Sequence, residues 1–134
     1  MPFYTPTDMR HSKGANNPLI ERKSAVGEFM KVGIVTKPEG QGSPLHEHPN
    51  EEQFTLILEG EMHFILGDED RVVGPGTIVH IPRNTRHRSR SVNGPCTFFA
   101  IKSPAGDGEL SQDHKERPKA EWDEAEKLYP GRTR

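Results

Sequence analysis

Six short apolar runs follow one another between Val26 and Pro104: FMKVGIV, FTLILE, MHFIL, RVV, TIVHI and CTFFAI. Each run is rich in β-branched or aromatic residues and is bounded by Gly, Pro, Asn or Asp. Such runs are typical of antiparallel strands joined by turns, and no amphipathic helix of ordinary length fits among them. FTLILE and MHFIL are predicted to form a hairpin about Glu59-Gly60. The pattern predicts an all-β protein, built as a sandwich or a barrel.

The two ends of the chain differ from this middle region because they are polar. The chain has 134 residues, of which 31% are hydrophobic, so we expect one domain with a small core over residues 1–134. Its barrel core is expected at about residues 26–104. Residues 1–25 are predicted to form a polar N-terminal arm, and residues 105–134 a C-terminal tail.

The tail contains one candidate helix. Pro118 can open it, and Trp122 and Ala125 would then share a face with Leu128 or Tyr129. We expect this face to pack on the barrel of the same chain or on a neighbouring subunit. Several arginines near the end of the apolar region are likewise expected on a solvated outer face or at a subunit contact: Arg83, Arg86, Arg88 and Arg90.

The charge balance gives no support for a nucleic-acid or membrane partner. The chain has 18 basic and 20 acidic residues, a net charge of −2, whereas such partners select strongly basic surfaces.

No apolar run approaches the roughly 20 residues that cross a bilayer, and the N-terminus, MPFYTPTDMR, lacks the apolar core of a signal peptide. A single cysteine, Cys96, excludes an internal disulfide. We therefore expect a soluble, cytoplasmic protein.

Two histidines one residue apart, in the stretch PLHEHPN, carry the main chemical signal. In a strand His46 and His48 point the same way, so both imidazoles can reach one ion. Neutral imidazole is a good ligand for zinc, iron, nickel and copper. His87 starts a later predicted strand and could be the third ligand. We assign no role to the other histidines: His11, His63, His80 and His114.

The residues around the histidine pair match the first sequence motif of the cupin family. That motif is a Gly, five residues, His-x-His, three or four residues, an acidic residue or Gln, six residues and a Gly. Here it consists of Gly40, QGSPL, the HEH triplet, PNEE, Gln53, FTLILE and Gly60.

A second cupin motif is a Gly, five residues, Pro-x-Gly, two residues, His, three residues and Asn. The stretch GTIVHIPRNTRHRSRS, residues 76–91, follows it with two departures. Asn84 replaces the Gly, a mild change because Asn tolerates left-handed backbone, and Ser91 replaces the Asn. The chain thus resembles a small single-domain, metal-binding cupin over roughly residues 26–104. The resemblance implies a double-stranded β-helix, or jelly-roll barrel, with a metal inside one end, and many such cupins are homodimers.

The resemblance also implies the ligand set. Counting back from Gly60 places the family's fourth ligand on Gln53, whereas a three-residue gap after His48 would place it on Glu52. We therefore expect four metal ligands: His46, His48, Gln53 and His87. Glu52 is the alternative to Gln53, and Glu51, which shares strand parity with Gln53, could reach the pocket. We expect one divalent transition metal ion: iron, manganese, nickel, copper or zinc.

Strand parity predicts the walls of the pocket. With Gln53 turned inward Thr55 faces in as well, whereas His63 on the return strand points out. On the last strand, the inward face is either that of Phe98 or that of Phe99. One face of an earlier strand is formed by Met30, Val32 and Ile34. Taken together, the inward residues of all these strands predict a mainly apolar lining. The pocket candidates are Glu51, Thr55, Met62, Phe64, Ala100 and Lys102.

Three classes of function follow from these expectations. The first is a metal-dependent enzyme acting on a small oxygenated organic substrate, for which a dioxygenase is our leading hypothesis. The second uses the metal as a Lewis acid without oxygen, in an isomerase, decarboxylase or polyketide cyclase. Within it, ketonisation of unsaturated uronates is disfavoured, because Ala100 and Lys102 stand where those cupins carry an acid and a Phe. The third is a non-catalytic small-molecule-binding cupin.

Overall fold

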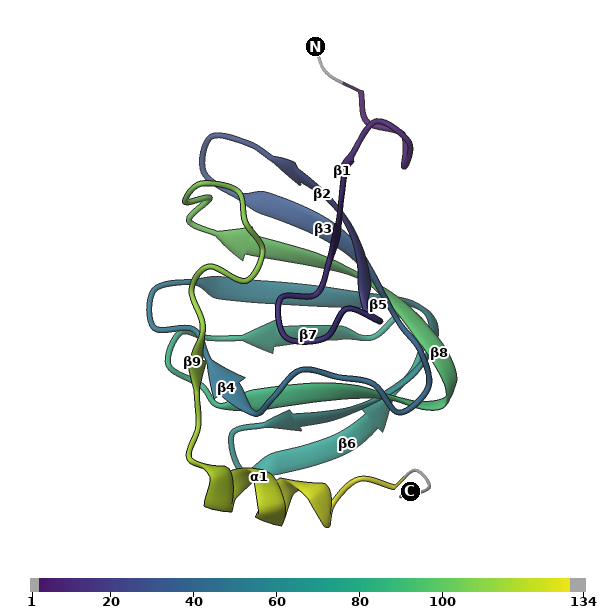
Figure 1. Ribbon diagram of the computed structural model, residues 1–134, viewed down its shortest axis with the longest axis vertical. Helices are drawn as coiled ribbons and strands as arrows, with labels where there is room; N and C mark the ends of the chain where they lie inside the picture. Colours follow the sequence, from purple (N-terminus) through teal and green to yellow (C-terminus); the bar gives the residue numbers. More distant parts are fainter. Residues whose placement is uncertain (1–2, 131–134) are drawn as a thin grey trace.

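The computed structural model describes residues 3–130, and its ribbon is mostly β (Figure 1). These residues contain nine strands and one short helix. The elements are β1 (Arg10–Lys13), β2 (Glu21–Val26), β3 (Lys31–Lys37), β4 (His46–Glu47), β5 (Glu52–Leu66), β6 (Glu69–Val73), β7 (Ile78–Ile81), β8 (His87–Ser103), β9 (Lys115–Glu116) and α1 (Lys119–Glu126). The predicted all-β fold with a short C-terminal helix is confirmed.

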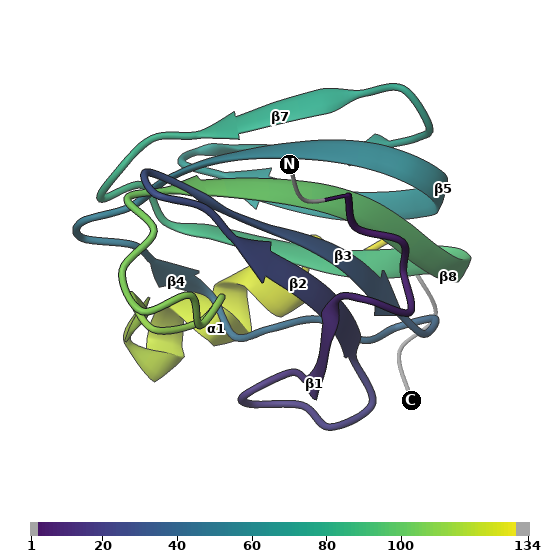
Figure 2. The ribbon, with the colours of Figure 1, turned by 90° about the horizontal axis from the view of Figure 1, so that it is seen from above.

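Two long strands, β5 and β8, hold the barrel together. β8 pairs antiparallel with β3, β4 and β5, and β5 pairs in turn with β6 and β7. Seen from above, β5 and β7 lie on one side of the molecule and β2, β3 and β4 on the other (Figure 2). The side chains enclosed between these two sides form the hydrophobic core, which includes Val35, Ile57, Met62, Phe64 and Phe98.

The predicted hairpin at Glu59-Gly60 is wrong. β5 continues through these residues and stays paired to β8 on both sides of them, with two register shifts between. Gly60 has a φ of 81°, and a Cβ at this position would lie 2.1 Å from the carbonyl oxygen of Pro95. Gly60 therefore marks an irregularity where the two strands bend in close contact, and only glycine fits there.

The N-terminal arm extends the barrel sheet. β1 pairs with β2, and β2 with β3, so strand pairing begins at Arg10, within the predicted arm. The loop between β1 and β2 is tied to the barrel by Asn17, whose Nδ2 donates a 2.8 Å hydrogen bond to Gln41 Oε1. This loop contributes to the wall of the pocket described below.

The face of β3 that points inward is not the apolar face. Lys31, Gly33, Val35 and Lys37 are buried, whereas the residues that alternate with them are less buried, and Met30 just before the strand is 47% exposed. Gly33 belongs to the inward face too, and a Cβ there would lie 2.6 Å from Leu110 Cδ1. The inward face of β3 expected from Met30, Val32 and Ile34 is therefore wrong, and β3 brings two lysines inside.

The helix α1 packs on the barrel of its own chain, one of the two predicted alternatives. It lies along the end of the molecule near β6 (Figure 1). Trp122 and Ala125 pack against Leu45 and Ile65, and the buried Tyr129 donates a 2.6 Å hydrogen bond to the carbonyl oxygen of Ser91. No helix within residues 3–130 is long and apolar enough to cross a membrane.

Three of the arginines predicted on the outer face form ion pairs with glutamates of α1. Arg86 Nη1 lies 3.4 Å from Glu121 Oε1, and Arg88 Nη1 lies 3.4 Å from Glu126 Oε2. Arg90 Nη1 approaches Glu126 Oε1 at 2.7 Å. The outer position was predicted correctly, but these side chains bind α1 instead of facing solvent or another subunit.

Candidate metal centre

Three histidines converge inside the barrel, in the way their strand positions predicted. His46 in β4 is the cross-strand partner of His87, the first residue of β8, and His48 follows β4 directly. Their ring centroids are 4.3 Å apart for His46 and His87, 4.9 Å for His46 and His48, and 4.8 Å for His48 and His87. One ring nitrogen from each lies within 4.8 Å of the others, and all three side chains are buried.

Backbone carbonyl groups fix the orientation of each ring. The Nδ1 atom of His46 is 2.5 Å from Pro44 O, that of His87 is 2.9 Å from Thr85 O, and that of His48 contacts Asp113 O. A carbonyl oxygen only accepts hydrogen bonds, so each Nδ1 carries the proton and each Nε2 carries a lone pair. Within residues 3–130, no hydrogen bond engages any of these three Nε2 atoms.

The three rings are neutral at ordinary pH. Burial, together with the charge of Lys102, lowers the pKa of His48 to about 4. Burial also lowers the pKa of His87 to about 3 and places that of His46 well below its ordinary value. Neutral imidazoles with free Nε2 atoms fit a divalent transition metal ion, the class predicted from the sequence. The His46, His48 and His87 group could therefore bind a metal.

Gln53 and Glu52 lie on opposite faces of β5. Gln53 is buried and lines the cavity next to the three histidines, with its Nε2 donating a 2.8 Å hydrogen bond to Thr55 Oγ1. Glu52 is exposed on the outside, where its carboxylate lies 2.7 Å from His80 Nε2. The structure thus brings Gln53 to the histidines and keeps Glu52 away from them.

The histidines open onto a cavity of about 110 Å³. Four of the predicted pocket candidates line it: Thr55, Phe64, Ala100 and Lys102. The other two do not line it: Met62 belongs to the hydrophobic core, and Glu51 is paired with Lys31 at 2.7 Å, with a carboxylate oxygen within 4.8 Å of a ring nitrogen of His48. The sequence did not decide which face of β8 points inward, and in the structure it is the face that carries Phe98.

Lys37 and His114 are pocket residues that the sequence did not reveal. Lys37 Nζ donates hydrogen bonds to Ser89 O at 3.0 Å and to Ser89 Oγ at 2.8 Å, and burial lowers its pKa to about 7. His114, to which the sequence assigned no role, stacks on His46 with centroids 4.3 Å apart. Burial lowers its pKa as well. The position of Lys37 could have been predicted from the sequence, because Lys37 lies on the same face of β3 as the core residue Val35. No sequence pattern points to His114.

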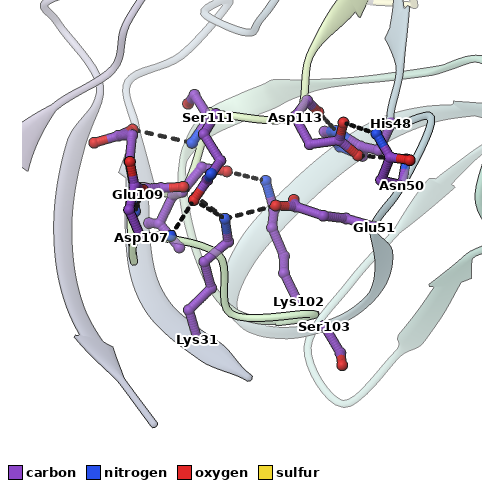
Figure 3. Close-up of polar contacts among 12 residues, drawn as sticks. Lys31, His48, Asn50, Glu51, Lys102, Ser103, Asp107, Glu109, Ser111 and Asp113 are labelled. Carbon is purple, nitrogen blue, oxygen red and sulfur yellow. Dashed lines mark hydrogen bonds and ion pairs between the residues drawn. The ribbon is translucent and has the colours of Figure 1, made fainter. Parts of the chain in front are cut away.

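Residues 105–114, the covering segment, close one wall of this cavity. Figure 3 shows its contacts with the barrel. Lys31 Nζ reaches Glu109 O at 2.6 Å and Gln112 Oε1 at 3.2 Å, and Lys102 Nζ donates to Leu110 O at 2.5 Å. At the end of the segment Asp113 accepts hydrogen bonds from the backbone and side chain of Asn50. The segment belongs to the predicted tail, yet Leu110, Ser111 and His114 line the pocket.

Comparison with known proteins decides the family. Residues 33–102, more than half of the chain, match the cupin domain family model. The chain is a cupin. The barrel of this cupin superposes on KdgF from Halomonas sp. with a TM-score of 0.70 at 21% identity, covering 78% of this chain and 94% of that one. It also superposes on an RmlC-like cupin from Shewanella frigidimarina with a TM-score of 0.69 at 16% identity, covering 78% and 92%. These likenesses confirm the predicted jelly-roll barrel.

One curated relative is closer in sequence. This cupin is 38% identical over 85 residues to the dimethylsulfoniopropionate lyase DddQ of Ruegeria pomeroyi. The match covers 63% of this chain and 41% of that relative, so the cupin spans less than half the length of the lyase it resembles.

Proposed function

We propose that this cupin is a metal-dependent enzyme that acts on a small, negatively charged organic substrate without oxygen, as a lyase or isomerase. One observation carries the proposal. Three histidines with free Nε2 atoms share a cavity with the buried ammonium groups of Lys37 and Lys102. Such a cavity suits a carboxylate or enolate, because it offers positive charge where that anion would lie.

The chain's own residues have distinct parts in this proposal. His46, His48 and His87 would hold the metal, with Gln53 beside them. A bound divalent ion polarises a carbonyl or carboxylate oxygen and so makes the neighbouring C–H bond more acidic. Lys102, which donates one hydrogen bond to Leu110 O, has further N–H groups for the oxygens of the substrate.

A proton acceptor is also present. Within the described residues, the buried Nε2 atom of His114 has no hydrogen-bond partner, and Glu116 Oε2 lies 3.8 Å from it. The ring lines the cavity and stacks on His46. A neutral imidazole in this position could take a proton from a substrate carbon, as a lyase or an isomerase of carboxylates requires.

The relative supports the oxygen-independent reaction. A lyase acting on dimethylsulfoniopropionate, as that relative is named, breaks a bond in a carboxylate without oxidising it. The dioxygenase reaction expected from the sequence stays a prediction, because a three-histidine site is compatible with both chemistries. The non-catalytic alternative, the homodimer and the cytoplasmic location also stay predictions.

The metal site is tested by three substitutions. We expect the wild type to bind near one equivalent of zinc, iron, manganese, nickel or copper, and His87→Ala to bind it at least about 100-fold more weakly, because one of three imidazole ligands is lost. Gln53→Ala should weaken binding less, and the matched control Glu52→Ala should leave it unchanged. Metal content after dialysis, measured by elemental mass spectrometry, distinguishes these results. A loss in Glu52→Ala but not in Gln53→Ala would make Glu52 the ligand.

The reaction class is tested by turnover with and without air. A panel of small carboxylates and 2-oxo acids, including dimethylsulfoniopropionate, is incubated with the metal-loaded protein and followed by proton NMR. We expect product under nitrogen at the same rate as in air, and none with His87→Ala. Turnover that stops without oxygen would contradict the proposal and favour the dioxygenase.

A further inference from the structure

Two buried lysines in the wall of the pocket, Lys37 and Lys102, form no direct ion pair within residues 3–130, although the charge of the Glu51 carboxylate partly offsets the lowering of the pKa of Lys102 by burial. Lys37 is 4% exposed and Lys102 is 8% exposed. Lys37 donates only to Ser89, and Lys102 only to Leu110 O. In the part of the chain that the structure describes, neither ammonium group forms an ion pair. Lys31, which is equally buried, differs because it contacts Glu51 at 2.7 Å.

A buried ammonium group without a counter-ion is unfavourable for folding. Simple packing does not explain two of them, because a methionine would fill the same space without charge. Both side chains line the cavity of the three histidines. A negatively charged ligand in this cavity would supply the counter-charge that the two ammonium groups lack.

The two lysines approach the histidines from different directions. On β8, the cross-strand partner of Lys37 is Cys96, whereas Lys102 lies six residues further along that strand. Lys37 binds Ser89, two residues beyond His87. Lys102 instead pairs across the sheet with Gln53. One anionic group at each lysine would match this arrangement better than a single carboxylate.

We propose that the pocket takes a substrate with two negatively charged groups, a small dicarboxylate, and rejects one with a positively charged group. This inference rests on the proposed function, since the same cavity holds the histidines. It separates this cupin from its lyase relative, whose named substrate carries a sulfonium cation. A cation placed between two buried ammonium groups would be repelled by both.

Binding of three carboxylates to the zinc-loaded protein tests the inference. Glutarate, butyrate and dimethylsulfoniopropionate all carry a carboxylate on a short chain, but they end in an anion, a neutral group and a cation. We expect isothermal titration calorimetry at pH 7 to show glutarate binding at least about tenfold more tightly than butyrate. Dimethylsulfoniopropionate should bind more weakly than butyrate.

Matched variants assign the preference to the two lysines. Lys37→Met and Lys102→Met should each reduce the preference for glutarate over butyrate to less than about threefold, while zinc content stays at the wild-type level. Lys37→Gln and Lys102→Gln repeat the test if a methionine variant misfolds. The control Lys119→Met removes the same charge from an exposed side chain and should keep the wild-type preference.

The possible results separate this inference from the proposed function. Equal binding of glutarate and butyrate to zinc-loaded wild type would overturn the inference and leave the metal-dependent function standing. Tighter binding of dimethylsulfoniopropionate than of butyrate would overturn it too, as would a preference for glutarate that survives both lysine substitutions. A protein that binds neither zinc nor any of the three carboxylates would overturn both proposals.

Discussion

Replacing Lys31 by Met is expected to destabilise the protein by about 3 kcal/mol. Lys31 is fully buried and its Nζ contacts Glu51 Oε2 at 2.7 Å, Glu109 O at 2.6 Å and Gln112 Oε1 at 3.2 Å. Methionine fills the space but leaves a buried carboxylate and two other oxygens without their donor. Urea unfolding followed by circular dichroism measures the loss.

Two further variants show whether the buried ion pair is responsible. The double variant Lys31→Met/Glu51→Leu removes both charges and should be more stable than Lys31→Met alone, because no unpaired carboxylate remains. The control Lys13→Met breaks an exposed pair with Glu21, in which both side chains are at least 60% exposed, and should change stability by less than about 1 kcal/mol. Strict additivity of the Lys31 and Glu51 substitutions would contradict this account.

Replacing Lys37 by Met is expected to change the stability in the opposite direction. It should stabilise the protein by about 2 kcal/mol near pH 6. Burial lowers the pKa of Lys37 from 10.5 to about 7, which corresponds to a penalty of several times ~1.4 kcal/mol for the charged form. Loss of the two hydrogen bonds to Ser89 offsets part of the gain, at about 1 kcal/mol each. Thermal and urea unfolding of the two proteins at pH 6 measure the difference.

The stabilisation by Lys37→Met should decrease as pH rises. Below pH 7 Lys37 is charged in both the folded and the unfolded chain, so the full penalty applies to the wild type. Between pH 7 and about 10.5 only the unfolded chain binds the proton, and the wild type therefore becomes relatively more stable as pH rises. The advantage of Lys37→Met should shrink between pH 6 and pH 9. A destabilised variant, or a gain that grows with pH, would show that Lys37 is not a buried, unpaired ammonium group.

Local patterns in the sequence were sufficient to predict the barrel and the histidine cluster. The alternation of side chains in a strand puts His46 and His48 on one face, and the second motif supplies His87. The same parity separates Gln53 from Glu52, which the structure places on opposite faces of β5. Asn84, predicted to tolerate left-handed backbone, has a φ of 59°. Apart from the meeting of His87 with His46 and His48, which depends on the pairing of β4 with β8, each of these features is set by residues close together in the chain.

Features set by contacts between distant residues were not predictable. Parity alone cannot tell which face of β3 is buried, and the apolar side chains suggested the wrong one, because the protein turns Lys31 and Lys37 inward. Gly60 resembled a turn, although it is required by the close passage of Pro95. The covering segment has the polar composition of a solvated loop, and the hydrogen bonds from Lys31 that hold it span 78 and 81 residues.

The covering segment has a consequence for how such a protein can diversify. It begins after residues 33–102, the part that matches the family, so the histidines and the wall above them are encoded in separate stretches. A change within residues 105–112 can therefore reshape this wall without replacing a metal-binding side chain, whereas Asp113 and His114 contact His48 and His46. Grafting different residues at positions 105–112, with Asp113 and His114 kept, is a direct way to redirect this barrel to other substrates while the histidines keep their contacts.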